Sequence, residues 1–491
     1  MPPTYADTDL AHARALRERG LVDTAALRLL RELCTGIGAR PAGSPADAQA
    51  QAWARTALGQ LGLESVRAED FALRIWQRGP AAARLLASDI SRTLTIAALG
   101  NSVATAVGGI DAEVAWYPDL AALRAEPTEP GRSRAHGRIV FIDQRTERTR
   151  DGRGYGTAVG ARINGPVEAA RRGALALAIR SIGTSGAGGT SGTSGTSGTS
   201  GTSGTGSTSG ASGTGDTAGA LTTTAPVAHT GATRYDLSVP RIPAFAVSVP
   251  DADFIAAEQA AGRPLRLQLS LDARSGVDAR SANVIAEWRG TDLAHEVVLI
   301  GAHLDSWDVG QGAQDNGAGV AIVSAAAGVI AAAGRRARRT IRVVLFGNEE
   351  NGFDGALDYG NRHKDEPHQL VAESDFGAGR LYAFASRVAP AALPLTAQIA
   401  EVLAPLGIAQ AEGSGRNAGS PGPDAALLMR RHRWPALALA QDGSRYFDVH
   451  HTADDTLDRL DPHALPQNVA AWAAMAWLTA QAPLSFGPPA L

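Results

Sequence analysis

The sequence predicts an α/β sandwich, in which a mixed, largely parallel sheet carries helices on both faces. The segments HEVVLIGAH (295–303) and RTIRVVLFGNEE (339–350) have the pattern of buried strands, and GAGVAIVSAAAGVIAAAG (317–334) between them has that of an apolar helix. Together they make one β–α–β crossover, the unit of a parallel sheet. Charged residues follow both strands, and ligands bind at the carboxyl ends of parallel strands. We therefore expect a functional site at this edge of the sheet.

Length and composition favour a globular protein of two or more domains. The chain has 491 residues, of which 44% are hydrophobic, and a formal net charge of -3. Its arginines are scattered among acidic residues rather than gathered in blocks, so we expect no nucleic-acid partner. With a single cysteine, Cys34, no disulfide can form within the chain. Any metal ligands must then be histidines and carboxylates.

The ends and the hydropathy of the chain bear on its location. The first residues lack the charged and apolar regions of a signal peptide, and no apolar run reaches the roughly 18 residues of a membrane span. We therefore expect no membrane segment and a cytoplasmic protein. A trimmed start would instead be compatible with a periplasmic or secreted one.

The texture of the sequence divides the chain into three parts. Residues 1–112 and 282–491 are expected to form the main domain, and residues 113–281 a β-rich insert that begins with strand patterns such as GRIVFID (137–143). Within the insert, residues 183–219 repeat the unit GTS. This composition cannot bury enough apolar surface to offset the entropy of ordering, so a disordered surface loop is expected.

Three strand ends in the second half finish in residues that bind metals: His303 and Asp305, Glu349 and Glu350, and Glu373 and Asp375. Burying so many charges at one edge of a sheet is costly unless a cation neutralises them. Histidine and carboxylate ligands without thiolates suit a catalytic zinc ion, although cobalt or manganese would also fit.

Spacing assigns different duties to neighbouring residues. His303 and Asp305 are two apart, so in an extended segment they point the same way, and Asp305 can orient the ring while His303 binds metal. The side chains of the adjacent Glu349 and Glu350 diverge. One can bind metal while the other faces the substrate as a base.

Four motifs carry a family resemblance: HLDSWDVGQGAQDNGAG, NEENGFDGALDY, ESDFG and YFDVHHTADDTL. They resemble those of the M28 family of zinc exopeptidases, most of all its carboxypeptidase Q-like branch with a protease-associated insert. The segments GARPAGSPA and HTGATRYDLSVPRIPAFAVS resemble that branch outside the site. The resemblance implies the three-layer zinc-exopeptidase fold, covers nearly the whole chain except the Gly/Ser/Thr repeat, and implies a homodimer.

The resemblance also implies a mechanism and its residues. Glu349 matches the general base of a hydrolysis that uses a water bridged by two zinc ions per chain, and the expected substrates are dipeptides or short peptides with a free N-terminus. Asp315 matches the ligand shared by the two ions, and its bond to Asn316 is expected to be cis. The five matched metal ligands are His303, Asp315, Glu350, Asp375 and His451.

Other roles stay open at this point. His450 or Tyr446 is our candidate donor to the tetrahedral oxyanion, because both precede His451. Recognition of a chain end needs a further group, and three acidic residues near the motifs are candidates: Asp308, Asp354 and Asp442. The sequence departs from the family pattern at Asn316, where relatives often have Asp, and at Asn348, where Ala is more usual.

Two other functions are compatible with the same scaffold. A glutaminyl-cyclase-like acyltransferase would bind one zinc ion and lack the full bridging set, whereas both Asp315 and Asp375 are present here. A receptor-like binding protein would have lost metal ligands, and this chain retains all five. Hydrolysis by two metal ions is therefore the favoured hypothesis.

Overall fold

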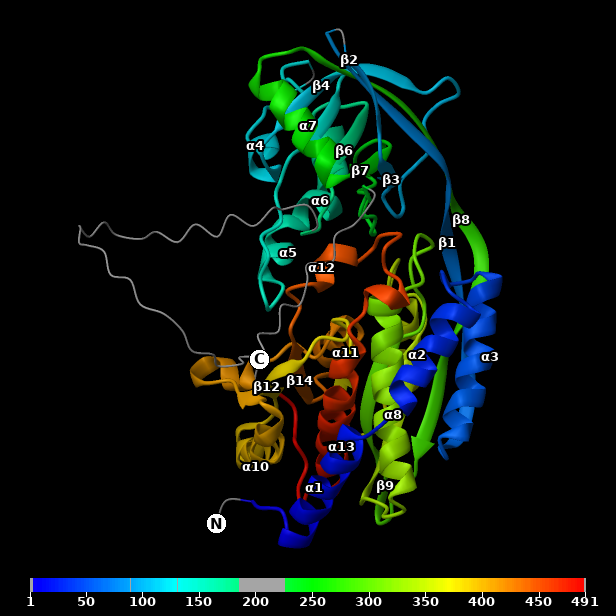
Figure 1. Ribbon diagram of the computed structural model, residues 1–491, viewed down its shortest axis with the longest axis vertical. Helices are drawn as coiled ribbons and strands as arrows, with labels where there is room; N and C mark the ends of the chain where they lie inside the picture. Colours follow the sequence, from blue (N-terminus) through cyan, green and yellow to red (C-terminus); the bar gives the residue numbers. More distant parts are fainter. Residues whose placement is uncertain (1–2, 89, 130, 185–225, 490–491) are drawn as a thin grey trace, which may run out of the picture.

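The centre of the molecule is a mixed, largely parallel sheet (Figure 1). The computed structural model describes residues 3–88, 90–129, 131–184 and 226–489. The middle strand β9 runs parallel to β10 and β11, while the outer strands β12 and β8 run antiparallel to their inner neighbours. In order, the strands are β13 (Ala409–Gln410), β12 (Leu381–Arg387), β14 (Ala436–Gln441), β11 (His368–Glu373), β9 (Leu293–His303), β10 (Arg339–Phe346) and the end of β8 (Leu265–Trp288).

Helices cover both faces of this sheet, as the sequence predicts. Successive residues of β10 alternate between two buried clusters, with Val343 in one and Val344 in the other. The helices of the first cluster are α1 (Asp7–Leu21), α2 (Ala25–Gly36), α3 (Pro45–Gln60), α8 (Ala318–Ala332), α10 (Leu393–Leu403) and α13 (Leu465–Gln481); those of the second are α9 (Asp354–Arg362) and α11 (Pro423–His432).

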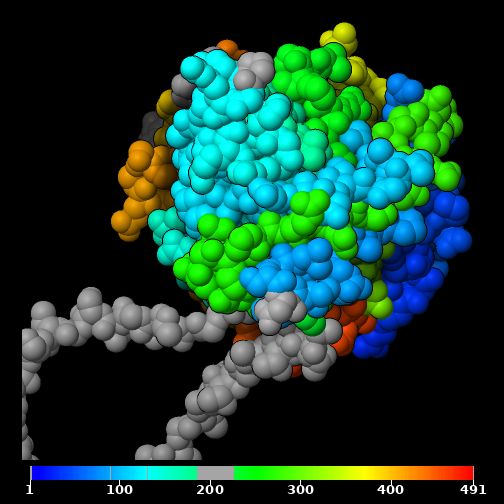
Figure 2. Space-filling view, turned by 90° about the horizontal axis from the view of Figure 1, so that it is seen from above, coloured from blue at the N-terminus to red at the C-terminus, as the bar shows by residue number. Residues whose placement is uncertain are grey.

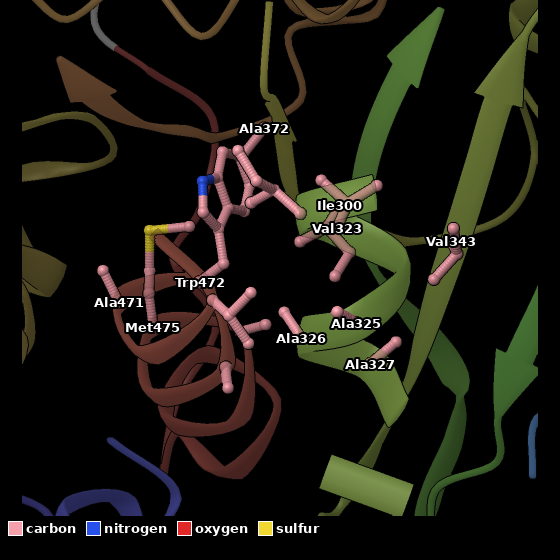
Figure 3. Close-up of a cluster of buried hydrophobic side chains, with 14 of the residues drawn as sticks. Ile300, Val323, Ala325, Ala326, Ala327, Val343, Ala372, Ala471, Trp472 and Met475 are labelled. Carbon is pink, nitrogen blue, oxygen red and sulfur yellow. The ribbon is translucent and has the colours of Figure 1, made fainter. Parts of the chain in front are cut away.

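The helix α8 lies between the sheet and α13. It is apolar on all sides, as expected of a helix buried on all sides. It packs against α13, from which Trp472 enters the same buried cluster as Ile300, Val323 and Ala372 (Figure 3). The segment Ala313–Ala332 is long and apolar enough to cross a membrane, but 83% of its most apolar 18-residue window is buried inside the molecule. It is therefore explained as the core helix of this fold.

Two long strands connect the insert to the main sheet. β1 (Glu64–Ala87) and β8 pair as an antiparallel ribbon that leaves the main sheet and enters a second one (Figure 1). The further strands there are β2 (Ile90–Leu94), β3 (Ile96–Ala98), β4 (Ile110–Tyr117), β5 (Ile139–Ile142), β6 (Ala176–Arg180) and β7 (Ala244–Val247). Its helices are α4 (Leu120–Arg124), α5 (Arg153–Ala158), α6 (Gly160–Arg171) and α7 (Val249–Ala260).

Seen from above, the insert covers one end of the molecule (Figure 2). Its core also includes Trp76, Leu85 and Leu94, which precede the β-rich texture of the sequence. The boundaries at residues 112 and 281 stay a prediction, because β1 and β8 belong to both sheets. Most of the Gly/Ser/Thr repeat, residues 185–219, lies outside the described residues.

Short helical segments complete the chain. Two of them, α12 (Tyr446–Val449) and the turn Ala313–Gly317, lie at the site described below. The remaining short turns are 3-10 helices at Pro390–Ala392, Ala404–Leu406, Gly413–Asn417, Leu457–Arg459 and Pro462–Ala464.

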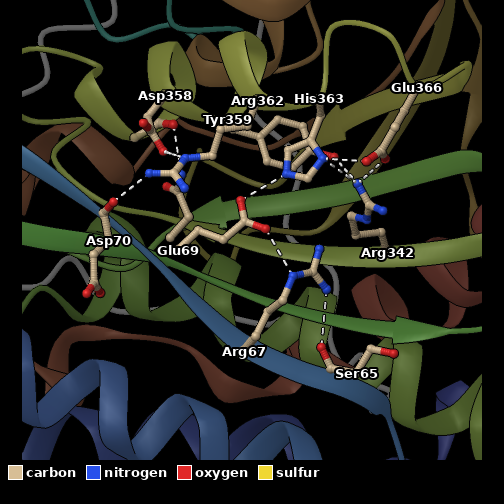
Figure 4. A network of polar contacts seen from close by, with 12 residues as sticks. Ser65, Arg67, Glu69, Asp70, Arg342, Asp358, Tyr359, Arg362, His363 and Glu366 are labelled. Atoms are coloured by element: carbon tan, nitrogen blue, oxygen red, sulfur yellow. Dashed lines mark hydrogen bonds and ion pairs between the residues drawn. The ribbon is translucent and has the colours of Figure 1, made fainter.

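A buried polar network ties β1 to the second face of the sheet (Figure 4). His363, just after α9, contacts Glu69 of β1 at 2.9 Å through Nε2 and Glu366 at 2.7 Å through Nδ1. Arg342 of β10 donates to Glu366 at 2.7 Å and to the Tyr359 hydroxyl at 3.0 Å. The network therefore fixes the lower half of the ribbon that carries the insert.

Candidate metal centre

The predicted ligands meet at the carboxyl edge of the main sheet. His303 is the last residue of β9, Glu350 follows β10 and Asp375 follows β11. Asp315 lies in the turn Ala313–Gly317 before α8, and His451 follows α12. The five side chains are all buried. They also lie within about 3.3 Å of one another in pairs, so the fold brings the five residues together as the sequence predicts.

Asp315 stands between two groups of ligands. Its Oδ1 lies 3.1 Å from Nε2 of His303, which is also 3.3 Å from Oδ1 of Asp375. Its Oδ2 lies 3.0 Å from Nε2 of His451, which is also 3.1 Å from Oε2 of Glu350. We call these groups the His303 half-site and the His451 half-site. The bond between Asp315 and Asn316 is cis, as expected.

The donor set fits a pair of divalent cations. Each half-site has one imidazole nitrogen and one carboxylate of its own and shares Asp315, a combination that suits zinc. Oε1 of Glu350 is buried and has no hydrogen-bond partner among the described residues. An unpaired carboxylate oxygen in such a cluster is a position that a metal ion would satisfy.

Without a cation, the cluster must hold protons. Burial and the Asp315 charge raise the pKa of Glu350 to about 7, and burial also raises that of Asp375. Burial opposes protonation of His451, yet Glu350 and Asp315 raise its pKa to about 9. Since metal ions compete with protons for these atoms, binding should release protons.

Asp305 organises the turn that carries Glu349 and Glu350. Its carboxylate accepts backbone N–H groups from Glu349 at 3.1 Å and from Glu350 at 3.4 Å. Nδ1 of His303 is closer to the carbonyl oxygen of Asp305, at 3.0 Å, than to the carboxylate, at 3.6 Å. The backbone of Asp305 thus orients His303, while its side chain holds the turn of the predicted base.

Glu349 lines the cleft in front of the ligands. Burial raises the pKa of its carboxyl group well above the usual range, and the carboxylates of Asp375, Glu350 and Asp315 add to this, against the opposing charge of His303. A carboxyl group with a raised pKa can accept and return a proton near neutral pH.

His450 and Tyr446 also lie at the centre. Nε2 of His450 is 3.3 Å from Oδ2 of Asp315, and its ring stacks on that of His451 at 3.5 Å. The Tyr446 ring is 4.9 Å from that of His450, and both residues line the cleft. Burial and the neighbouring His451 hold the pKa of His450 well below its usual value. His451 contacts two carboxylates and His450 one, which favours His451 as the ligand.

Two positioning residues were missed in the sequence. Arg40 is fully buried and donates to carbonyl oxygens of Leu304, Gln311 and Gly312, at 2.5, 2.7 and 3.0 Å. It thereby joins the two ends of the loop between His303 and Asp315. Asp455 accepts backbone N–H groups from Gln314 at 2.6 Å and from Asp315 at 3.1 Å. The available signals were the motifs that contain them, GARPAGSPA and HHTADDTL.

The three acidic candidates for chain-end recognition all have partners. Asp308 pairs with Arg78 at 2.9 Å, and Asp442 with Arg150 at 2.9 Å. Asp354 accepts a hydrogen bond from Asn348 at 2.6 Å. None of the three lines the cleft that contains Glu349, so this cleft gives them no place beside a substrate.

The two departures from the family pattern have structural roles. The Asn316 side chain donates to the Ser374 carbonyl at 2.9 Å and accepts the N–H of Gly319 at 3.1 Å. Its amide is therefore used in packing the start of α8. Asn348 has a positive φ of 61° and its side chain reaches Asp354, so it shapes the turn before α9.

The cleft is closed on one side by the insert. It has a volume of about 580 Å³, and Asp315, Glu349 and His451 form part of its wall. The insert contributes the facing residues, which include Asn101, Tyr155, Arg162 and Arg234. A substrate would therefore lie between the two parts of the chain.

A sheet with buried ligands at its carboxyl edge, a carboxylate shared by two half-sites and an acidic residue facing a cleft define a metal-dependent hydrolase. Residues 283–476 match the model of peptidase family M28. The chain belongs to this family and is a metallopeptidase. It is 31% identical to carboxypeptidase Q of Bos taurus over 421 residues, 85% of this chain and 77% of that protein. It is also 31% identical to the Homo sapiens carboxypeptidase Q over 425 residues, 86% of this chain and 78% of that protein.

Solved structures show the same architecture. A crystal structure of a peptidase M28 precursor from Shewanella amazonensis has a TM-score of 0.86 and 38% identity, and the match covers 99% of each chain. A zinc aminopeptidase from Bacillus subtilis has a TM-score of 0.56 at 16% identity, with 92% of this chain and 93% of that chain covered. The predicted fold class is thereby confirmed.

Proposed function

We propose that this metallopeptidase is an exopeptidase that hydrolyses dipeptides or short peptides with a free N-terminus, using two zinc ions. The observation that carries the proposal is the position of Asp315, whose two oxygens face different histidines. A carboxylate in this position suits two ions side by side, as in two-metal hydrolases. The names of the relatives, carboxypeptidase Q and a zinc aminopeptidase, support an exopeptidase and zinc.

The residues divide into ligands and proton carriers. His303 and Asp375 would hold one ion, His451 and Glu350 the other, and Asp315 both. Bound zinc supplies Lewis acidity, which polarises a carbonyl group and lowers the pKa of water toward about 7. Glu349 takes a proton from the attacking water at its carboxylate and delivers it to the nitrogen of the leaving amine. His450 or Tyr446 donates a hydrogen bond to the developing oxyanion.

The insert supports action on short substrates. Its residues Tyr155, Arg162 and Arg234 face the ligands across a cleft of about 580 Å³. A cleft closed on one side holds a short segment of chain more readily than the middle of a folded protein. The homodimer and the cytoplasmic location stay predictions from the sequence.

A panel of dipeptides with free and blocked termini, assayed with zinc present, tests the proposal. We expect cleavage only of dipeptides with a free amino end. Equal cleavage of amino-blocked dipeptides would overturn the proposed requirement for a free N-terminus. Elemental analysis should find two zinc ions per chain. One ion per chain would favour the single-zinc acyltransferase chemistry of a glutaminyl-cyclase-like enzyme.

A further inference from the structure

The two ligand histidines are held in different ways. Nδ1 of His303 contacts the carbonyl of Asp305, two residues along the same loop. The contacts of Nδ1 of His451 come from the insert: the Thr230 carbonyl at 3.3 Å and the Arg162 guanidinium at 3.2 Å. The group that contacts the second ring nitrogen of a ligand histidine sets its tautomer and orientation. The His451 half-site therefore depends on a part of the chain outside the main sheet.

Thr230 binds the backbone of His451 as well as its ring. Its N–H donates to the His451 carbonyl at 2.9 Å, and its own carbonyl is the acceptor available to Nδ1. Since Nε2 faces the carboxylates of the half-site, a proton on Nδ1 points to Thr230. Gly231 follows at a φ of 129°, and a Cβ there would lie 2.8 Å from Nδ1 of His451. The two segments thus meet without an intervening side chain.

Arg78 of β1 holds Thr230 in place. Its Nη2 donates to the Thr230 hydroxyl at 3.0 Å, and Thr230 in turn donates to the Ala98 carbonyl at 2.7 Å. The same guanidinium makes a two-pronged pair with Asp308, with Nε 2.9 Å from Oδ2 and Nη2 2.9 Å from Oδ1. Arginine–carboxylate pairs of this form fix direction as well as distance.

Trp307 connects Asp308 back to His451. It precedes Asp308, is buried, and its ring centroid lies 5.6 Å from that of His451. On its other side it packs against Gly100 of the insert, where a Cβ would lie 2.2 Å from the ring. The contacts therefore form a closed path through Arg78, Thr230, His451, Trp307 and Asp308.

We propose that Arg78, Thr230, Trp307 and Asp308, here called the Thr230 clamp, position His451 and so couple metal binding at the His451 half-site to docking of the insert. The proposal rests on the proposed function, because it assumes an ion in each half-site. The ring of His303 is instead oriented by the carbonyl of Asp305, within the main domain, and not by the clamp. Loss of the clamp should therefore weaken the binding of one metal ion and leave the other unchanged.

Calorimetric titration of zinc into the metal-free full chain tests the coupling. The Arg78→Gln variant loses the charge and the two-pronged contact with Asp308. Loss of such a supporting contact typically costs roughly 10–100-fold in metal affinity. We expect a loss of this size for one of the two ions, the same affinity for the other, and an intermediate loss in Arg78→Lys, which retains the charge.

Thr230→Val is the second variant, because it removes the hydroxyl that Arg78 contacts and retains the backbone that contacts His451. It should also weaken one ion only. Arg138→Gln is the matched control, since it breaks the more exposed pair with Glu113 elsewhere in the insert. It should bind both ions as the wild type does, and circular dichroism confirms that each variant is folded.

The possible results separate the two proposals. Wild-type protein that binds only one zinc ion would contradict the proposed function. Wild-type protein that binds two ions, with folded Arg78→Gln and Thr230→Val variants that bind both equally well or lose both equally, would overturn the Thr230 clamp and leave the proposed function intact.

Discussion

The carboxylate of Asp315 places one oxygen 3.1 Å from Nε2 of His303, and its other oxygen faces a different histidine. This position makes Asp315 the residue that the two half-sites have in common. Asp315→Ala should therefore reduce zinc content from two ions per chain to fewer than one, whereas Asp375→Ala should retain one. Elemental analysis after dialysis measures the difference. Equal zinc content in the two variants would show that Asp315 does not bridge.

Glu349→Gln separates proton transfer from metal binding. The amide cannot accept a proton, so kcat should fall by about 100-fold to 10,000-fold, the usual contribution of general acid–base catalysis. Glu349 is absent from both half-sites, and its neighbour Glu350 would still bind metal. Steady-state kinetics with zinc analysis of the same sample checks both points. Activity near the wild-type level would remove Glu349 from the role of base.

His450 and Tyr446 are distinguished by single substitutions. Tyr446→Phe removes only the hydroxyl, and His450→Ala removes the ring that stacks on His451. Substitution of the residue that stabilises the oxyanion should lower kcat more than it raises KM, because that contact forms in the transition state. A donor in an oxyanion hole contributes about 100-fold to 1,000-fold to kcat. An unchanged kcat excludes the residue from this role.

The sequence predicted those parts of the molecule that depend on local pattern. Strand–helix–strand periodicity around 295–350 was sufficient for the layered sheet. The resemblance of four motifs to a known family implied the five residues that the fold brings together. The long strand β1 was missed, because it passes from one sheet into another and its burial pattern changes along its length. Arg40 and Asp455 were missed although they lie in recognised motifs, because their partners are backbone atoms and their roles depend on how the chain folds.

Charge alone does not assign a role to Asp308. Asp308 sits in the middle of the metal-binding loop and was a candidate for the substrate's chain end, yet its partner is Arg78, 230 residues away in sequence. Such a pairing depends on how the insert docks. It could be read only from the three-dimensional structure.

Arg40→Met tests the loop between His303 and Asp315. The substitution leaves the carbonyls of Leu304, Gln311 and Gly312 without their buried donor, and each such unsatisfied group costs about 1–3 kcal/mol. We expect a lower free energy of unfolding and weaker binding of both zinc ions, since the loop supplies a ligand to each half-site. Chemical denaturation and zinc titration measure the two effects. Wild-type zinc affinity in a destabilised variant would limit Arg40 to a role in stability.

The His363 network predicts a pH dependence of stability that is independent of the metal centre. Burial opposes the charge of His363, but Glu366 and Glu69 hold its pKa above the usual value, so its stabilising effect is fully present below the unfolded pKa. The effect is lost as pH rises through the raised folded pKa. Glu366, with a pKa lowered to about 2, stays ionised throughout this range.

His363→Gln should therefore lower the free energy of unfolding most at pH 5, by about 2 kcal/mol given that hydrogen bonds to charged groups contribute about 1.5–3 kcal/mol each. The difference from the wild type should shrink as the pH is raised toward 9, because the charge of His363 is lost as the pH rises through its raised folded pKa. Urea denaturation of metal-free protein at both pH values measures it. His295→Gln, which alters an exposed histidine 4.0 Å from Glu296, is the control. A loss of stability that is the same at both pH values would show that His363 acts by packing rather than by its charge.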